Sequence, residues 1–351
     1  MSMAGSDSST PIHGGQLRAA AMRYGIPLPD WLDLSTGINP LGWPVAIIPD
    51  GVWARLPEDN DGLVDAASRY YGTTNLLPVA GSQAAIQRLP ALRRDHCRVG
   101  VITPSYSEHA YAWRNAGHAV QELKTAEIEA ALDQLDVLIL VNPNNPTGEY
   151  WRPDVLLGWQ QRLAAHGGWL IVDEAYIDPT PELSLVSHSH QSGLIVLRSL
   201  GKFFGLAGLR VGFVFAEAVL RERLAASLGP WAVANPSRWV AAQALVDTAW
   251  QLATRERLLV DSRRLCTVLQ KHDLVVTGGC VLFQWIVCDR ADIIHERFAR
   301  QGILTRLFIA PMSLRFGLPG TEADWFRLDS ALSAISGELA TIPPHTRNSS
   351  Q

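Results

Sequence analysis

The chain is organised around the stretch Arg198-Ser199-Leu200-Gly201-Lys202-Phe203-Phe204-Gly205-Leu206-Ala207-Gly208-Leu209-Arg210-Val211-Gly212. An apolar run at residues 194–197 leads into it and predicts a buried strand. One lysine, Lys202, lies among the small and apolar residues between Ser199 and Arg210. A lysine ammonium is strongly hydrated, so a lysine in these surroundings either extends its amine to water or is held in place for chemistry.

The side chains around Lys202 favour chemistry. An uncharged lysine amine adds to aldehydes. Ser199 and Arg210 flank it with a hydroxyl donor and a permanent cation, which together suit a phosphate group. Pyridoxal 5′-phosphate (PLP) carries both an aldehyde and a phosphate. The stretch therefore favours a PLP site, and a surface lysine after a strand is the alternative.

Composition limits the classes of function. The 351 residues suggest about two domains, and contents of 47% hydrophobic and 18% charged residues are typical of a globular enzyme. A formal net charge of -4 without a long basic run argues against nucleic acid as a partner. We find no uncharged apolar run of about 18 residues, so the sequence predicts no association with a membrane through a spanning helix.

The sequences of the two termini and the spacing of the cysteines bear on the cellular location of the protein. Residues 1–10 are serine-rich and lack the apolar core of a signal peptide, and we expect them and the polar tail at 343–351 to be disordered. The four cysteines form no CxxC pair and no metal-binding spacing, which favours reduced thiols in a cytoplasmic protein without a metal site. They are Cys97, Cys266, Cys280 and Cys288.

The middle of the chain alternates between strands and helices. This pattern requires crossover connections and predicts an α/β fold with a mostly parallel sheet. The predicted strands cover residues 98–103, 119–123, 137–141, 169–172, 194–197 and 211–215, and the predicted helices cover 61–71, 108–116 and 153–166. In sheets of this kind ligands bind beyond the carboxyl ends of the strands.

The residues that follow these strands form a set that PLP requires. Asp173 can hold the pyridine nitrogen protonated, so that the ring accepts electrons. Asn145 and Tyr176 can donate to the phenolic oxygen, and the ring of Tyr106 can stack on the cofactor. A second glycine turn, before Ser82, opens a helix whose free N–H groups suit a phosphate. The predicted phosphate ligands are Ser82, Gln83, Ser199 and Arg210.

Three of these segments carry a resemblance to a known family. The motifs at residues 144–148, 172–176 and 199–210 resemble fold-type I PLP enzymes of the aminotransferase superfamily, over roughly residues 30–340. Within it the chain is similar to the histidinol-phosphate aminotransferase group. It is more similar still to the threonine-phosphate decarboxylases of cobalamin biosynthesis, through His13-Gly14-Gly15 and the segments at 33–35 and 38–42.

The resemblance implies a large PLP-binding domain, with a mostly parallel sheet flanked by helices, and a smaller α+β domain. Residues 11–38 would pack with the small domain, 39–246 would form the large domain, and 247–342 the small one. The small domain is predicted to contain helices at 247–272, 293–301 and 322–339. Its predicted strands cover 274–277 and 281–287, with shorter ones ending near Arg306 and at 314–317.

The resemblance also implies a homodimer, and one residue departs from the family pattern. Relatives commonly have an Arg-Tyr-Pro segment whose tyrosine reaches the cofactor phosphate in the partner subunit. Here the matching residues are Arg55, Leu56 and Pro57, and Leu56 has no hydroxyl to donate.

The implied reaction is decarboxylation of L-threonine O-3-phosphate to (R)-1-amino-2-propanol O-2-phosphate. Lys202, Asp173 and Tyr176 would be catalytic. A substrate with a carboxylate and a phosphate needs several cationic or donor groups, and the resemblance assigns this role to His13, Asn39, Arg306 and Arg315.

Two alternatives remain open at the level of sequence. Transamination of a histidinol-phosphate-like substrate uses the same set, because the two reactions differ in which substrate bond is held perpendicular to the cofactor ring. A non-catalytic PLP-binding regulator would need an added DNA-binding module. Only about thirty residues precede Asp33, which we expect to be too few for such a domain.

Overall fold

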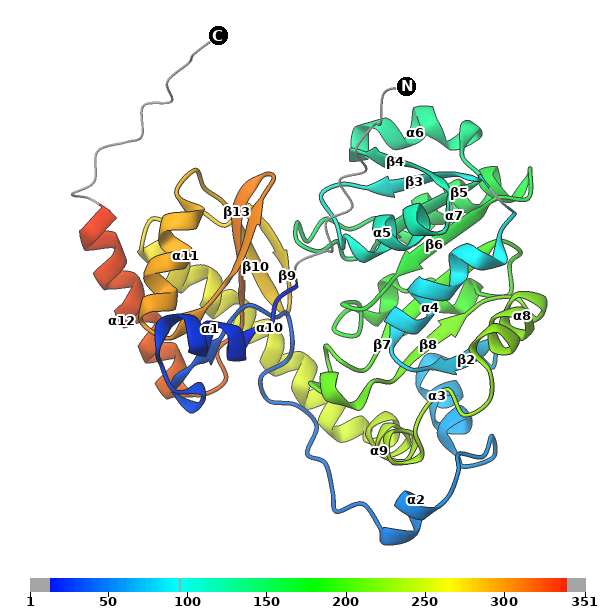
Figure 1. The fold of residues 1–351 in the computed structure, drawn as a ribbon, viewed down its shortest axis with the longest axis horizontal. Coiled ribbons are helices and arrows are strands. Elements are labelled where there is room, and N and C mark those ends of the chain that lie inside the picture. The colour runs from blue at the N-terminus through cyan, green and yellow to red at the C-terminus, as the bar shows by residue number, and fades with distance from the viewer. Residues whose placement is uncertain (1–12, 95, 340–351) are drawn as a thin grey trace.

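The protein is described by a computed structural model that covers residues 13–94 and 96–339 (Figure 1). The disorder predicted for residues 1–10 and 343–351 lies outside these described residues. Two bodies lie side by side. One is built on a large sheet, and the other on a smaller sheet covered by the C-terminal helices (Figure 1). No helix in the described ranges is long and apolar enough to cross a membrane.

The large sheet has seven strands in the order β2-β8-β7-β6-β5-β3-β4. From β4 to β7 the strands are parallel. At the other edge β8 runs antiparallel to β7, and β2 pairs antiparallel with β8. The strands are β2 (Leu76–Val79), β3 (Arg98–Ile102), β4 (Ala119–Leu123), β5 (Val137–Val141), β6 (Trp169–Asp173), β7 (Leu194–Ser199) and β8 (Gly212–Phe215). This confirms the predicted α/β fold with a mostly parallel sheet.

The central strands are apolar throughout because helices cover both faces of the sheet. Along β5, Leu138 and Leu140 belong to the core on one face, while Val137 and Ile139 belong to the core on the other. Strand β6 alternates in the same way. Successive side chains of a strand point to opposite faces, so in a strand that is buried on both faces every position favours an apolar residue.

Helices α4, α5 and α8 contribute to the core on one face, and α3, α6, α7 and α9 to the core on the other. Their bounds are α3 (Leu63–Tyr71), α4 (Ser82–Arg88), α5 (Glu108–Asn115), α6 (Ile128–Ala131), α7 (Pro153–Ala164), α8 (Ala218–Leu228) and α9 (Asn235–Val246). Helix α3 ends at Gly72, which has φ +72°, a left-handed conformation that favours glycine. The predicted helices at 61–71, 108–116 and 153–166 are confirmed within two residues at each end.

The second body contains a four-stranded antiparallel sheet, in the order β12-β13-β10-β9. Its strands are β9 (Gly278–Cys280), β10 (Phe283–Val287), β12 (Arg306–Ile309) and β13 (Met312–Gly317), and its helices are α10 (Thr248–Lys271), α11 (Ala291–Arg300) and α12 (Glu322–Leu339). The strand predicted at 274–277 is wrong. These residues are a connection without regular structure, in which only the Thr277 N–H donates to the Trp285 carbonyl of β10, at 2.9 Å, and the strand that pairs with β10 begins at Gly278.

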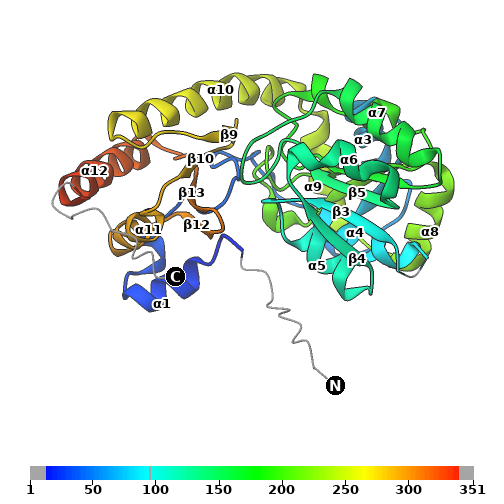
Figure 2. The ribbon, with the colours of Figure 1, turned by 90° about the horizontal axis from the view of Figure 1, so that it is seen from above.

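The N-terminal segment joins this second body. Helix α1 (Leu17–Tyr24) packs on α11, and β1 (Leu32–Asp33) pairs in parallel with β11 (Ile303–Leu304). Helix α10 begins where the carboxylate of Asp247 accepts from the Trp250 N–H, and then runs from one body to the other (Figure 2). Because each body has its own sheet, we propose the boundaries predicted from the sequence, 39–246 and 247–342, as the domain limits.

The remaining elements are short. Helix α2 covers Asp50–Ala54. Turns of 3-10 helix lie in the connections, at Leu28–Asp30, Leu89–Leu92, Thr125–Glu127, Leu132–Gln134, Pro181–Leu183, Val186–His188 and Ala207–Leu209.

Candidate active site

A cavity opens beyond the carboxyl ends of β3, β5, β6 and β7. These strands are parallel neighbours, so the loops that follow them meet at one edge of the sheet. All nine residues predicted to bind the cofactor line this cavity. They are Ser82, Gln83, Tyr106, Asn145, Asp173, Tyr176, Ser199, Lys202 and Arg210.

Asp173 lies at the last position of β6 and is buried. One carboxylate oxygen accepts from the Ala175 N–H at 3.1 Å, and the other lies 3.0 Å from Nε2 of His109. His109 is itself buried, so its contact with Asp173 orients this carboxylate. A buried carboxylate held in this way suits a protonated pyridine nitrogen, because the two charges offset each other's loss of hydration.

The opposite end of the cavity is suited to a phosphate. Hydroxyls come from Ser82 at the start of α4 and from Ser199 at the end of β7, and the cation comes from Arg210. The backbone of Gly81 lies so close to this arginine that a Cβ there would be 2.6 Å from Nη2. The glycine therefore makes room for the guanidinium beside the two hydroxyls.

The amides and the aromatic ring are arranged between these two ends. The Oδ1 atom of Asn145 accepts from Arg315, which leaves the Nδ2 donor for a ligand in the cavity. The hydroxyl of Tyr106 donates to Oε1 of Gln83 at 3.2 Å, and burial raises the pKa of this phenol. The other end of the Gln83 amide donates to Glu108 at 2.5 Å.

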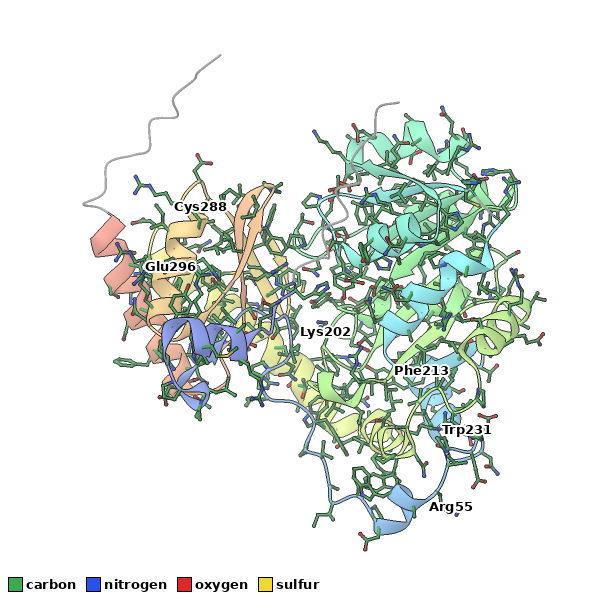
Figure 3. The ribbon with its side chains drawn as sticks, viewed as in Figure 1. Arg55, Lys202, Phe213, Trp231, Cys288 and Glu296 are labelled. Carbon is green, nitrogen blue, oxygen red and sulfur yellow. The ribbon has the colours of Figure 1, made fainter. Side chains whose placement is uncertain are left out.

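Lys202 lies between the two bodies of the molecule (Figure 3). Its amine is 5.3 Å from the ring centroid of Tyr176. Lys202, Tyr176, Tyr106 and Asn145 line the cofactor cavity and also a second, adjoining cavity. The lysine therefore stands at the junction of the two.

The second cavity contains three of the four residues predicted to bind the substrate. His13, Arg306 and Arg315 line it, together with Ser105 and other polar residues. They come from the N-terminal segment and from β12 and β13, on the far side of the site from the large sheet. Residues from the two ends of the chain thus meet opposite Lys202.

The two arginines face each other across neighbouring strands, because Arg306 pairs with Arg315 in the register of β12 and β13. Burial and the charge of Arg315 lower the pKa of Arg306. The Nε atom of Arg315 is buried, and no hydrogen-bond partner for it is found in residues 13–94 and 96–339. Two neighbouring cations repel each other, and a ligand with negative charge would relieve that repulsion.

Asn39 is the exception among the predicted substrate ligands. Its buried Nδ2 donates to the carbonyl of Phe203 at 2.8 Å, and its Oδ1 accepts from Arg257 at 2.9 Å. It lines neither cavity. The structure places this amide next to the Lys202 turn instead, because both of its ends are already bound to protein groups.

A group of buried charged side chains connects the loop after Asp173 with strand β7, which ends at Ser199. Arg198 pairs with Glu174 at 3.3 Å and with Asp178, and its Nη1 donates to Ser184 at 3.1 Å. Burial alone would lower the pKa of the guanidinium, but the charge of Asp178 raises it above its usual range. Burial raises the pKa of Glu174. These contacts tie the loop after Asp173 to the strand that ends at Ser199.

Sequence reasoning missed two residues of the site, His109 and Glu108, at the start of α5. A signal was present for His109, because it is three and four residues before Ala112 and Trp113, on the apolar stripe of a predicted helix. A polar residue on such a stripe needs a buried partner. The sequence does not show that this partner is Asp173.

Comparison with known proteins agrees with this geometry. Residues 59–333 match the family model described as aminotransferase class I and II. The chain belongs to this family. A threonine-phosphate decarboxylase from Pseudomonas aeruginosa is 57% identical over 320 residues, which cover 91% of this chain and 96% of the relative.

Solved structures show the same fold. Histidinol-phosphate aminotransferase from Sinorhizobium meliloti, in complex with PLP, has a TM-score of 0.81 at 19% identity, covering 96% of this chain and 100% of the other. L-Threonine-O-3-phosphate decarboxylase from Porphyromonas gingivalis has a TM-score of 0.74 at 21% identity, covering 86% and 98%. PLP is the cofactor of this enzyme, as predicted, and the charged ends and central lysine of the cavity fit it.

Proposed function

We propose that this protein is a PLP-dependent lyase that decarboxylates L-threonine O-3-phosphate, giving (R)-1-amino-2-propanol O-2-phosphate. The observation that carries the proposal is the cationic cavity beside Lys202, where Arg306, Arg315 and His13 converge. The near-full-length relative named threonine-phosphate decarboxylase supports it. By the resemblance of its motifs, the reaction belongs to cobalamin biosynthesis.

The residues that line the two cavities would have different roles in this reaction. Bound PLP supplies a conjugated ring that accepts the electrons released at the substrate α-carbon. Arg315 donates to Asn145 and to the Ser35 carbonyl, the latter at 2.8 Å, and in this fixed position it would bind and orient the substrate carboxylate. Arg306 and His13 bind the phosphate, and Asp173 keeps the ring nitrogen protonated.

Two groups would be able to return a proton to the α-carbon once carbon dioxide is released. They are the amine of Lys202 and the phenol of Tyr176, which both line the two cavities. The orientation of the substrate would separate this reaction from transamination. Arg315 would hold the carboxylate where it can leave, whereas an aminotransferase holds the substrate so that the α-proton is removed instead.

The test is release of carbon dioxide from L-threonine O-3-phosphate by the PLP-loaded protein, with L-threonine as the comparison. We expect release from the phosphorylated substrate and little from threonine, because threonine lacks the phosphate group that the cationic side chains of the cavity would bind. A keto product that depends on 2-oxoglutarate, without release of carbon dioxide, assigns the protein to the aminotransferases instead.

The proposal includes a homodimer. Large apolar side chains are exposed on the large body, including Ile47 (95%), Trp53 (64%), Leu56 (62%) and Trp231 (60%). The labelled Arg55 and Trp231 lie at the same end of the molecule (Figure 3). Contiguous exposed apolar surface marks sites where proteins associate, and we propose that these side chains belong to such a site. Sedimentation velocity is expected to give a dimer, and Trp53→Glu a shift towards monomer.

The small-molecule partner is thus a phosphorylated amino acid, and a second copy of the chain is the protein partner. The cytoplasmic location remains a prediction from cysteine usage. All four cysteines are free in the structure.

A further inference from the structure

The first turn of α5 contains a buried carboxylate that the reaction itself does not require. Glu108 is only 7% exposed. Its Oε1 atom lies 2.7 Å from Nε2 of His13, and its Oε2 atom accepts from Gln83 at 2.5 Å and from Gln87 at 3.0 Å. A buried carboxylate is costly unless it is paired with a cation and hydrogen-bonded.

His13 is the group that can supply that cation. The two glutamine amides are neutral, and His13 is the one base that forms an ion pair with Glu108 in the part of the chain that the structure describes. An imidazole that donates from Nε2 to a carboxylate can donate from Nδ1 as well only when it is cationic. At this position the Glu108 carboxylate would balance the charge of an imidazolium, which would keep its Nδ1–H as a donor for a substrate group.

The backbone of His13 is fixed as closely as its ring. A Cβ on Gly14 would lie 2.4 Å from the Ser35 carbonyl oxygen, and the Gly15 N–H donates to the Ser35 hydroxyl at 2.8 Å. The N-terminal segment is thus held on residues next to β1, while its histidine ring reaches across to α5 of the large body. The ring centroids of His13 and Tyr106 are 5.8 Å apart, so the histidine lies beside the cofactor cavity.

We propose that Glu108 is a positioning residue that fixes and charge-balances His13, and so sets the preference of the site for a phosphorylated substrate. This inference rests on the proposed function and adds to it the residue that determines specificity. Glu108 lines neither cavity. Its effect on the substrate phosphate passes through the imidazole.

The experiment is a double-mutant cycle with Glu108→Gln, His13→Ala and the double variant, each loaded with PLP. Steady-state kinetics with L-threonine O-3-phosphate and L-threonine give the preference for the phosphorylated substrate. We expect each single variant to lower that preference about 10- to 100-fold, as for the loss of one charge-assisted hydrogen bond. The double variant should be no worse than His13→Ala alone, because Glu108 acts through that ring.

A binding measurement without turnover accompanies the kinetics. In a Lys202→Ala background, calorimetric titration should show weaker binding of L-threonine O-3-phosphate after Glu108→Gln and unchanged binding of L-threonine, with bound PLP measured by absorbance in parallel. Glu122→Gln is the matched control, because it is the same substitution at an ion-paired glutamate away from the site. Glu122 lies on β4, at the edge of the large sheet, and pairs with Arg114, and these two side chains are 47% and 49% exposed.

The outcomes separate this inference from the proposed function. If the parent enzyme prefers the phosphorylated substrate, two results overturn the role of Glu108 and leave the proposed function standing. One is that the effects of Glu108→Gln and His13→Ala are additive, and the other is that Glu108→Gln leaves the preference unchanged. Equal use of both substrates by the parent overturns the proposed function itself. Loss of bound PLP in Glu108→Gln but not in Glu122→Gln also counts against the inference, because it assigns Glu108 to the cofactor through Gln83.

Discussion

Replacement of Arg198 by methionine tests the buried ion pairs that Arg198 makes with Glu174 and Asp178. Arg198 is 2% exposed on β7, and its guanidinium serves both Glu174 and Asp178, which are also buried. Methionine has a similar length and fills much of the same space, so the change removes the charge with little loss of packing. Two carboxylates would then remain in the interior without their cation.

The expected loss of stability follows from this burial. Removing one partner of a buried ion pair costs about 3–5 kcal/mol, because the remaining charge is left without water and without compensation. For a protein of this size each kcal/mol lowers the melting temperature by about 2 °C. Arg198→Met is therefore expected to melt about 6–10 °C below the parent.

Differential scanning calorimetry of the PLP-free proteins measures this difference, and Arg264→Met is the matched control. Arg264 makes two hydrogen bonds to Glu322, at 2.5 and 2.7 Å, but the two side chains are 40% and 81% exposed. Exposed pairs add little, so this variant should melt within about 2 °C of the parent. If Arg198→Met does not accumulate, Arg198→Lys, which keeps the charge, should. Equal melting temperatures for Arg198→Met and Arg264→Met would refute the reasoning.

Four further predictions concern the site and the response to pH. Lys202→Ala is expected to hold PLP only reversibly, so that borohydride fixes cofactor to the parent and not to the variant; cofactor fixed to the variant would contradict the assignment. Asp173→Asn should keep PLP but lose roughly 10²-fold in kcat, as on removal of one electrostatic stabiliser, and near-normal turnover would count against the geometry. Arg306→Ala should raise the KM for L-threonine O-3-phosphate about 10- to 100-fold with PLP content unchanged, and an unaltered KM would remove this arginine from the substrate site. Burial tends to raise the pKa of Asp136, but hydrogen bonds from the Arg98 N–H and from Arg94 hold this pKa below its usual value. The ionised carboxylate therefore stabilises the fold above about pH 4, and this stabilisation is lost as the pH falls further. The difference in melting temperature between the parent and Asp136→Asn should close on acidification from pH 7 to about pH 3, and a constant difference would exclude this cause.

The sequence by itself determined the fold class and the cofactor cavity. Strands β5 and β6 are apolar at every position that helices cover, and the ligands Asn145, Asp173 and Lys202 follow closely on strand ends. Parallel neighbouring strands end at one edge of a sheet, so residues at these positions must meet wherever the sheet forms. The prediction failed at 274–277, where Leu274 and Val276 pack on the core but the segment forms no strand, because a strand is defined by its pairing as well as by its side chains.

Only the tertiary structure decided which side chains contact one another. His109 and Asp173 are 64 positions apart, and His13 and Glu108 are 95 apart, so no local periodicity connects them. Asn39 suited a substrate by its type, yet packing places its amide against the Lys202 turn. Local sequence determines the conformation of a segment and the face it buries, whereas the partner of a buried polar group is settled only when distant segments pack and every such group must find a hydrogen bond.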